Sequence, residues 1–353
     1  ERCHPGIAPP SGTSLLVVHT PSPPHRSAHP SAADRTKRVV VARELGYCWG
    51  VRRALEIVEA AAESAGPIAP IGDVIHNPQV VERLRGKGVE GAASVDQAVE
   101  RGFRRVAITA HGMGPHLAVE AADAGTELID CTCPLVTKVQ RLAQKLVRQG
   151  YYLVVYGDHY HPEVRSVIGW AGTSKAVAAK KVADLPWNAP RGTTAPDAVT
   201  PPRKVAVVSQ TTKNVDELMA FAQELQAMVM PEGGEFRLCN TICEPTSERQ
   251  RALKRLVEED HVDLILAIGG RKSSNTARLA EVGQSMGVTS FHIERPEEIT
   301  AEWLQDVTTV GVTAGASTPD DVIEAVVAYL AERGYAPPPG GIRPVDPDYI
   351  PAY

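Results

Sequence analysis

The sequence lacks the features that mark several large classes of protein. No apolar run approaches the roughly 20 residues that a membrane-spanning helix needs. The formal net charge is only −5, so the charge balance favours neither nucleic acid nor an anionic membrane surface. We therefore expect neither nucleic acid nor a membrane among the partners of this chain.

Cysteine is also scarce, since six cysteines in 353 residues are too few for a disulfide framework. No CxxC pair occurs, which disfavours a zinc finger or ribbon, and the glycine-rich phosphate-binding loop that ends in Lys-Ser or Lys-Thr is absent. Free cysteines suit a reduced compartment, where they more often bind a metal or take part in catalysis. A chain of this length can hold two or three domains, each with its own core.

Three proline-rich stretches lie outside the regular pattern of the chain. We predict a disordered leader at residues 1–37, a surface loop at 187–203 and an irregular tail at 337–353. We expect a cytoplasmic protein. A plastid location would require residues 1–37 to act as a transit peptide, but their prolines break any amphipathic helix.

Between these stretches, short apolar strands alternate with amphipathic helices, which predicts an α/β fold with mainly parallel sheets. Residues 134–150, for example, predict a helix with Gly150 as its stop and an apolar face made of Leu135, Val139, Leu142 and Leu146. Strands are predicted at 38–42, 105–109, 127–130, 151–156, 204–209, 263–269 and 307–313. Because ligands bind beyond the carboxyl ends of parallel strands, we expect the chemistry where each strand gives way to a helix.

These strand-to-helix junctions are rich in cysteine, histidine, hydroxyl and amide side chains. Asn77, His161 and Thr318 each precede a proline, a pattern that predicts helix N-caps. Helix N-termini also attract phosphate through their unpaired N–H groups. The run Ser273-Ser274-Asn275, next to Arg271 and Lys272, accordingly resembles a small anion cradle.

Cys48 lies where a predicted strand ends and a helix begins, and Cys133 and Cys243 lie at two further junctions. Each of them could be a nucleophile, a metal ligand or part of the core. Three ligands from three separate α/β units would suit a site between those units. An iron–sulfur cluster held by three thiolates would also leave one iron free to bind a substrate oxygen, which a four-cysteine electron carrier cannot do.

Nine segments between about residue 39 and residue 332 together form a recognisable pattern. In order they are GYCWGVRRALEIVE, HNPQVVERLRGKGV, AHGMGP, TCPLVTKV, HPEVRSVIGW, SQTTKNVDE, ICEPTSERQ, GGRKSSNTARLAE and GVTAGASTPDDVIE. The set closely resembles the 4-hydroxy-3-methylbut-2-enyl diphosphate reductase family, also called IspH or LytB. One such motif would be a weak indication, whereas nine in the family's order are specific.

The resemblance implies three similar α/β domains around a pseudo-threefold axis, with a central [4Fe–4S] cluster. The family's cluster ligands fall on Cys48, Cys133 and Cys243. Its catalytic residues fall on Glu163, as the general acid, and on Thr211. Its diphosphate-binding residues fall on His76, His111, His161, Thr211, Ser273, Ser274, Asn275 and Ser317.

The chain also departs from the family pattern. Cys131 and Cys239 fall outside the ligand positions, so we interpret them as structural or incidental, and Trp49 stands where many members have a small residue. We expect a first domain at 38–133, a second at 134–240 and a third at 241–336. The strand before Cys48 could pack with the third of them.

The activity implied by the resemblance is reductive dehydroxylation of (E)-4-hydroxy-3-methylbut-2-enyl diphosphate. It yields isopentenyl and dimethylallyl diphosphate, the last step of the non-mevalonate isoprenoid pathway. The electrons would come from an external donor such as ferredoxin or flavodoxin. Two alternatives stay open: a non-redox iron–sulfur hydro-lyase that uses the same open iron without a reductant, and a non-catalytic protein with structural zinc on its cysteines.

Overall fold

The computed structural model describes residues 36–188 and 202–342. The predictions made for residues 1–35, 189–201 and 343–353 lie outside this part of the chain. Within it, no helix combines the length and the apolar character needed to cross a membrane.

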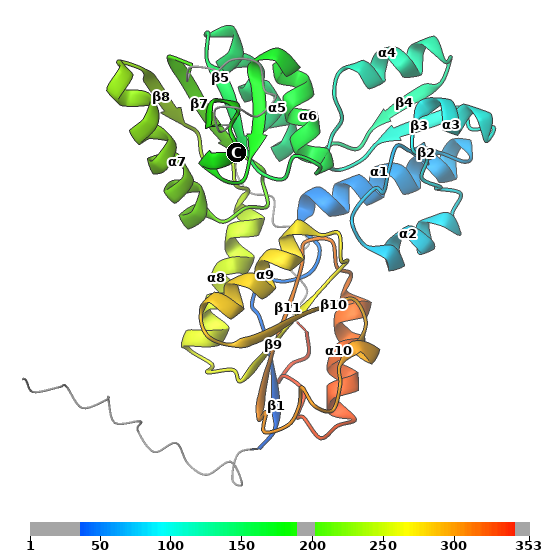
Figure 1. Ribbon diagram of the computed structural model, residues 1–353. Helices are drawn as coiled ribbons and strands as arrows, with labels where there is room; N and C mark the ends of the chain where they lie inside the picture. Colours follow the sequence, from blue (N-terminus) through cyan, green and yellow to red (C-terminus); the bar gives the residue numbers. More distant parts are fainter. Residues whose placement is uncertain (1–35, 189–201, 343–353) are drawn as a thin grey trace, which may run out of the picture. The chain divides into compact units, whose positions relative to one another are not determined.

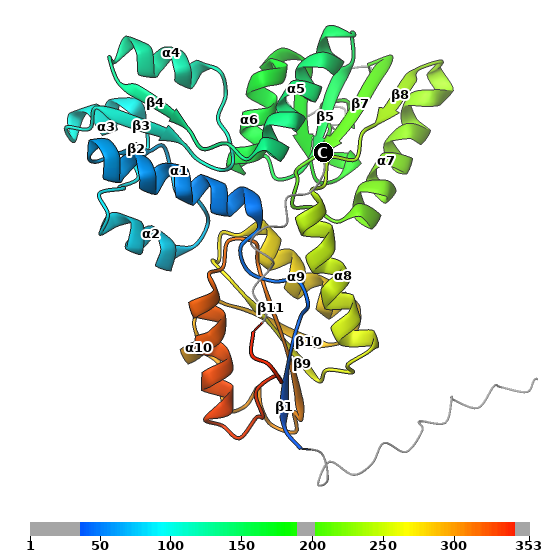
Figure 2. The same cartoon turned by 180° about the vertical axis from the view of Figure 1, so that it is seen from behind.

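Three parallel sheets form the framework of the described residues (Figures 1 and 2). Every pairing between their strands is parallel, which confirms the predicted α/β fold. Helices pack on both faces of each sheet, as parallel sheets require. Short 3-10 helices occur at Thr173–Lys175, Val182–Asp184, Pro186–Asn188, Met230–Glu232 and Pro296–Glu298.

The first sheet has the strand order β2-β3-β4. Its elements are α1 (Trp49–Ala65), β2 (Ala69–Pro70), α2 (Pro78–Arg85), α3 (Val95–Glu100), β3 (Arg105–Ile108), α4 (His116–Asp123) and β4 (Glu127–Asp130). Successive β3 side chains point to opposite faces, so Ala107 packs with α1 and α2 while Val106 packs with α3 and α4.

The middle sheet has the order β6-β5-β7-β8. Its elements are α5 (Pro134–Arg148), β5 (Tyr152–Tyr156), α6 (Pro162–Ala171), β6 (Ala176–Ala179), β7 (Lys204–Ser209), α7 (Val215–Val229) and β8 (Glu235–Leu238). Val155 of β5 packs with α5 and α6, and Val154 packs with α7 on the opposite face.

The third sheet has the order β1-β11-β9-β10 and joins the two ends of the described chain. Its elements are β1 (Arg38–Val41), α8 (Glu244–Glu258), β9 (Leu264–Ile268), α9 (Ser274–Ser285), β10 (Thr289–Ile293), β11 (Thr309–Ala314) and α10 (Asp320–Ala331). Val39 of β1 pairs with Val310 of β11. The strand before Cys48 therefore lies in the third sheet, whereas α1 after it packs on the first; the domain bounds themselves stay a prediction.

Four strands escaped prediction, namely β2, β6, β8 and β10, and each lies at the edge of its sheet. Edge strands are covered by fewer neighbours and are often short or polar, so they carry a weaker apolar pattern than central strands. The two-residue β2 even contains a proline, Pro70, which a central strand could not accommodate.

One local prediction is confirmed and one needs correction. The predicted apolar face of α5 packs on the core through Val139, Leu142 and Leu146, and Leu135 lines the pocket described below. Thr318 is not a helix N-cap, since α10 begins at Asp320 and the Thr318 hydroxyl donates to the Ile268 carbonyl instead.

Candidate active site

One pocket is lined by segments that follow the carboxyl ends of strands in all three sheets. All the residues that the sequence singled out as ligands or catalytic groups line it. They are Cys48, His76, His111, Cys133, His161, Glu163, Thr211, Cys243, Ser273, Ser274, Asn275 and Ser317. The structure thus brings these residues together, and their individual roles stay predictions.

Five of the pocket residues are also the N-caps of helices. Cys48, Cys133, His161, Cys243 and Ser273 cap α1, α5, α6, α8 and α9, respectively. Each helix N-terminus carries a partial positive charge and unpaired N–H groups. Several such ends around one pocket create a field that favours thiolates and phosphates over cations.

The sulfurs of Cys133 and Cys48 lie beside Gly50, and Cys243 lines the same pocket. A Cβ atom on Gly50 would lie 2.6 Å from the Cys133 Sγ and 3.9 Å from the Cys48 Sγ. Burial, together with the nearby Cys48, raises the pKa of the Cys133 and Cys243 thiols to about 12. These thiols keep their protons at neutral pH until a metal centre displaces them.

The three cysteines line the pocket from separate segments and form no disulfide. Three free thiols in one pocket are a donor set that suits an iron–sulfur cluster or a zinc ion. In residues 36–188 and 202–342, the cysteines do not form a set of three ligands within 4.8 Å of one another, so the spacing of the sulfurs does not choose between the two.

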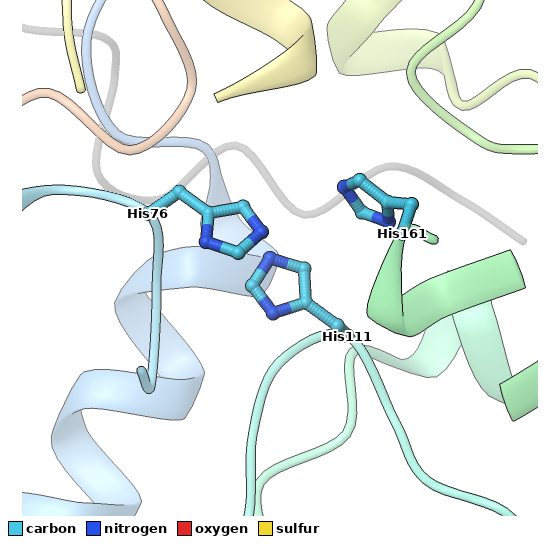
Figure 3. Close-up of side chains that lie close together, drawn as sticks. All are labelled: His76, His111 and His161. Carbon is cyan, nitrogen blue, oxygen red and sulfur yellow. The ribbon is translucent and has the colours of Figure 1, made fainter. Parts of the chain in front are cut away.

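Three histidine rings that line the pocket lie close together (Figure 3). The rings of His76 and His111 stack with their centroids 4.0 Å apart, and His161 meets them edge-on at 5.4 and 5.5 Å. Burial lowers the pKa of all three, that of His161 to about 4. They are therefore neutral at pH 7 and can each donate one N–H to a ligand.

Unpaired polar atoms of two residues that line the pocket point to a polar ligand. Asn275 is only 4% exposed, yet neither atom of its side-chain amide has a partner within the described chain. The same holds for Nδ1 of His76. Because a buried polar atom without a partner costs free energy, such atoms fit a ligand that supplies the missing hydrogen bonds.

The predicted anion cradle, Ser273-Ser274-Asn275, lines the pocket, whereas the neighbouring Arg271 and Lys272 do not. Arg271 donates to the His292 carbonyl and pairs with Glu298 instead, and the Lys272 side chain is 79% exposed. The pocket offers hydroxyls, an amide and imidazoles rather than a fixed cation at this position.

Glu163 is the one buried acid that lines the pocket in the part of the chain that the structure describes. Its carboxylate accepts hydrogen bonds from the Thr211 N–H at 2.6 Å and the Thr211 hydroxyl at 2.9 Å. Burial raises the pKa of Glu163 to about 7, although these bonds and the charge of Lys213 act in the opposite direction. A carboxyl group with such a pKa can give up a proton at neutral pH.

A family model described as LytB protein matches residues 39–331. The chain belongs to the LytB family. A 4-hydroxy-3-methylbut-2-enyl diphosphate reductase of Geobacter sulfurreducens is 38% identical over 296 residues, which cover 83% of this chain and 97% of that protein. The reductase of Aquifex aeolicus is 34% identical, with 83% and 96% covered.

Solved structures of the LytB family share the fold. The structure of E-1-hydroxy-2-methyl-but-2-enyl-4-diphosphate reductase from Plasmodium falciparum matches with a TM-score of 0.75 and 25% identity, over 86% of this chain and 91% of that one. A second structure, of the terminal enzyme of the non-mevalonate pathway, matches with a TM-score of 0.57 and 32% identity, over 84% and 99%. Proteins of this family carry an iron–sulfur cluster.

Two further residues that line the pocket, Thr246 and Gly50, were not anticipated from the sequence. Thr246, one turn after Cys243, places its hydroxyl 3.1 Å from that sulfur, and Gly50 gives the cysteines room. Their closeness in sequence to a cysteine at a helix start is the signal that could have found them. Cys131 and Cys239 do not line the pocket; both pack against apolar cores.

Proposed function

We propose that this chain is a 4-hydroxy-3-methylbut-2-enyl diphosphate reductase. It removes the 4-hydroxyl group of the allylic diphosphate with two electrons and two protons, releasing water and isopentenyl or dimethylallyl diphosphate. The observation that carries the proposal is the single pocket in which three cysteines, three histidines and a buried acid of a LytB-family chain converge.

The proposed cofactor is a [4Fe–4S] cluster on Cys48, Cys133 and Cys243. When bound, it supplies electrons and an iron that acts as a Lewis acid toward the substrate hydroxyl. The chain contributes the sulfurs, the space beside Gly50 and the positive ends of the helices α1, α5 and α8. Those helix ends favour the thiolate form of the ligands.

The diphosphate of the substrate would lie against His76, His111 and His161 and the hydroxyl and amide groups of residues 273–275. The histidine nitrogens lie within 4.8 Å of one another, a spacing that a single metal ion could also use. The helix N-termini around the pocket favour an anion there, and Asn275 has a free N–H as well as a free carbonyl. Contacts to a diphosphate orient the reacting end and thereby lower the barrier.

Glu163 would protonate the hydroxyl group as it leaves as water. Two hydrogen bonds from Thr211 hold the carboxyl group of Glu163 in place. They thereby also fix the direction in which the carboxyl group presents its own proton. Thr211 lines the pocket as well and would orient the proton between the carboxyl and the substrate. Burial, which keeps Glu163 protonated near neutral pH, supports this assignment.

The electrons would come from an external one-electron donor such as ferredoxin or flavodoxin. We place the enzyme in the cytoplasm, where free cysteines persist; the five within the described residues form no disulfide.

Turnover under two conditions tests this proposal. The protein is purified without oxygen and given the allylic hydroxy diphosphate, once with a chemical reductant and once without. We expect dehydroxylated products only with the reductant. Conversion without a reductant would indicate a hydro-lyase, and a colourless protein that contains zinc and no iron would indicate a structural metal site.

The pH profile follows from the pKa of Glu163. Because the acid must carry its proton, we expect kcat/KM to fall about tenfold per pH unit above pH 7. Below pH 7 the carboxyl stays protonated, so this group imposes no further change. Steady-state rates with excess reductant measure the profile, and a rate that stays constant or rises between about pH 7 and 9 would contradict it.

Affinity for inorganic diphosphate tests the histidine cluster without turnover. His111→Ala removes a buried donor, so we expect at least about tenfold weaker binding, the size of one hydrogen bond to a charged group. His159→Ala is the matched control, because His159 is exposed and does not line the pocket. Calorimetry measures both, and equal affinities of the two variants would exclude His111 from the diphosphate site.

A further inference from the structure

Arg249 links the segments that carry two of the three cysteines. It lies on α8, six residues after Cys243, and is only 1% exposed. Its Nη1 donates to the Pro245 carbonyl at 2.8 Å and its Nη2 donates to the Gly46 carbonyl at 2.7 Å. Pro245 follows Cys243 by two residues and Gly46 precedes Cys48 by two, so one guanidinium group spans both segments.

The positive charge of Arg249 has no acidic partner at close range. Within residues 36–188 and 202–342 no carboxylate lies within 4.0 Å of its guanidinium, and its Nε has no hydrogen-bond partner. Burial of a charge without a counter-charge is unfavourable. The guanidinium also reaches back to the first turn of α8, where the helix dipole repels cations.

Arg251, two residues further on, shows the ordinary arrangement. Its side chain is 57% exposed and pairs with Glu244 at the start of the same helix. A carboxylate does lie near one of the two segments, since Asp320 Oδ1 is 3.0 Å from the position of a Cβ on Gly46, but within the described residues it does not pair with Arg249. Thiolates on Cys48 and Cys243, formed when the site is loaded, lie on the two segments that Arg249 joins and would add further negative charge.

We propose that Arg249 is a positioning residue of the iron–sulfur site, which holds the Cys48 segment against the start of α8 and stabilises the reduced cluster by its charge. The inference rests on the proposed function, because it requires a cluster on the three cysteines. One-electron reduction by the external donor adds negative charge to the cluster. A buried cation nearby favours that step, because low polarity leaves the attraction poorly screened.

Three substitutions separate charge from hydrogen bonding. Arg249→Met removes both, Arg249→Gln keeps one donor group without the charge, and Arg249→Lys keeps the charge. We expect the equilibrium constant for cluster reduction to fall at least tenfold in the Met and Gln variants, a midpoint about 59 mV more negative for one electron. The Lys variant should stay within threefold of the wild type. Iron loss to a chelator should be at least threefold faster for Met than for Lys.

Redox titration followed by electron paramagnetic resonance measures the midpoint, and Arg251→Met serves as the control on the same helix. If Arg249→Met does not load iron, the Gln and Lys variants decide, since both donate hydrogen bonds and differ in charge. Equal midpoints for Gln, Lys and wild type would overturn the inference. A wild-type protein without a cluster would instead overturn the proposed function, so the two failures are distinguishable.

Discussion

Replacing Glu163 with glutamine is expected to lower turnover by about 10²- to 10⁴-fold, the usual contribution of a general acid. Glutamine has the same shape, so its oxygen can accept from the Thr211 N–H and its amide can donate to the Thr211 hydroxyl. It has no acidic proton to give to the leaving hydroxyl. Iron and sulfide content should be unchanged, because Glu163 is not a proposed cluster ligand.

Glu244→Gln provides the matched control for this experiment. Glu244 directly follows Cys243, but its side chain is exposed and pairs with Arg251. We expect this variant to turn over like the wild type and to keep the fall in rate above pH 7. Near-normal turnover in Glu163→Gln would mean that the proton comes from another group.

Gly50→Ala is expected to abolish cluster loading. The added Cβ would lie 2.6 Å from the Cys133 Sγ, so this sulfur could not keep its place. Gly50 lies inside α1, where alanine is favoured over glycine by about 1 kcal/mol. The helix itself should therefore not be weakened, and the defect should be confined to the metal site.

A second glycine tests whether this effect is specific. Gly86 ends α2 with an ordinary φ of −61°, and a Cβ there would meet only the Arg83 carbonyl at 3.4 Å. Gly86→Ala should load iron like the wild type. Circular dichroism establishes that both variants fold, and iron analysis establishes loading. A fully loaded Gly50→Ala protein would show that the sulfurs of Cys133 and Cys48 do not hold the cluster beside Gly50 as described.

The central strands and the helix starts could be predicted from the sequence, because both depend on local residues. Apolar runs such as 204–209 identify buried strands, and Asn77 and His161 cap their helices as predicted. Edge strands such as β8 and β10 escaped, since partial exposure dilutes their apolar pattern. Local pattern also could not assign β1 to the third sheet, because its pairing with β11 joins residues far apart in sequence.

Properties of the site that depend on burial could not be predicted from local sequence. The motif identified Glu163, but its raised pKa arises from packing that only the fold provides. Arg271 and Lys272 lie next to the predicted cradle in sequence, but their side chains pair with Glu298 and Asp73 outside it, which local sequence does not show. Arg249 could not be singled out from the sequence. Nothing in the sequence around it indicated that its side chain is buried between two segments that carry cysteines.

Iron and acid-labile sulfide analysis of protein purified without oxygen tests the central idea most directly, with Cys131 and Cys133 as a matched pair. The two cysteines lie two residues apart, but Cys133 lines the pocket and Cys131 packs in a core. We expect the wild type and Cys131→Ala to contain the same amount of cluster, each with one sulfide per iron. Cys133→Ala should contain almost no iron or sulfide. Full loading of Cys133→Ala, or zinc in place of iron in the wild type, would contradict the convergence of three cysteines on an iron–sulfur cluster.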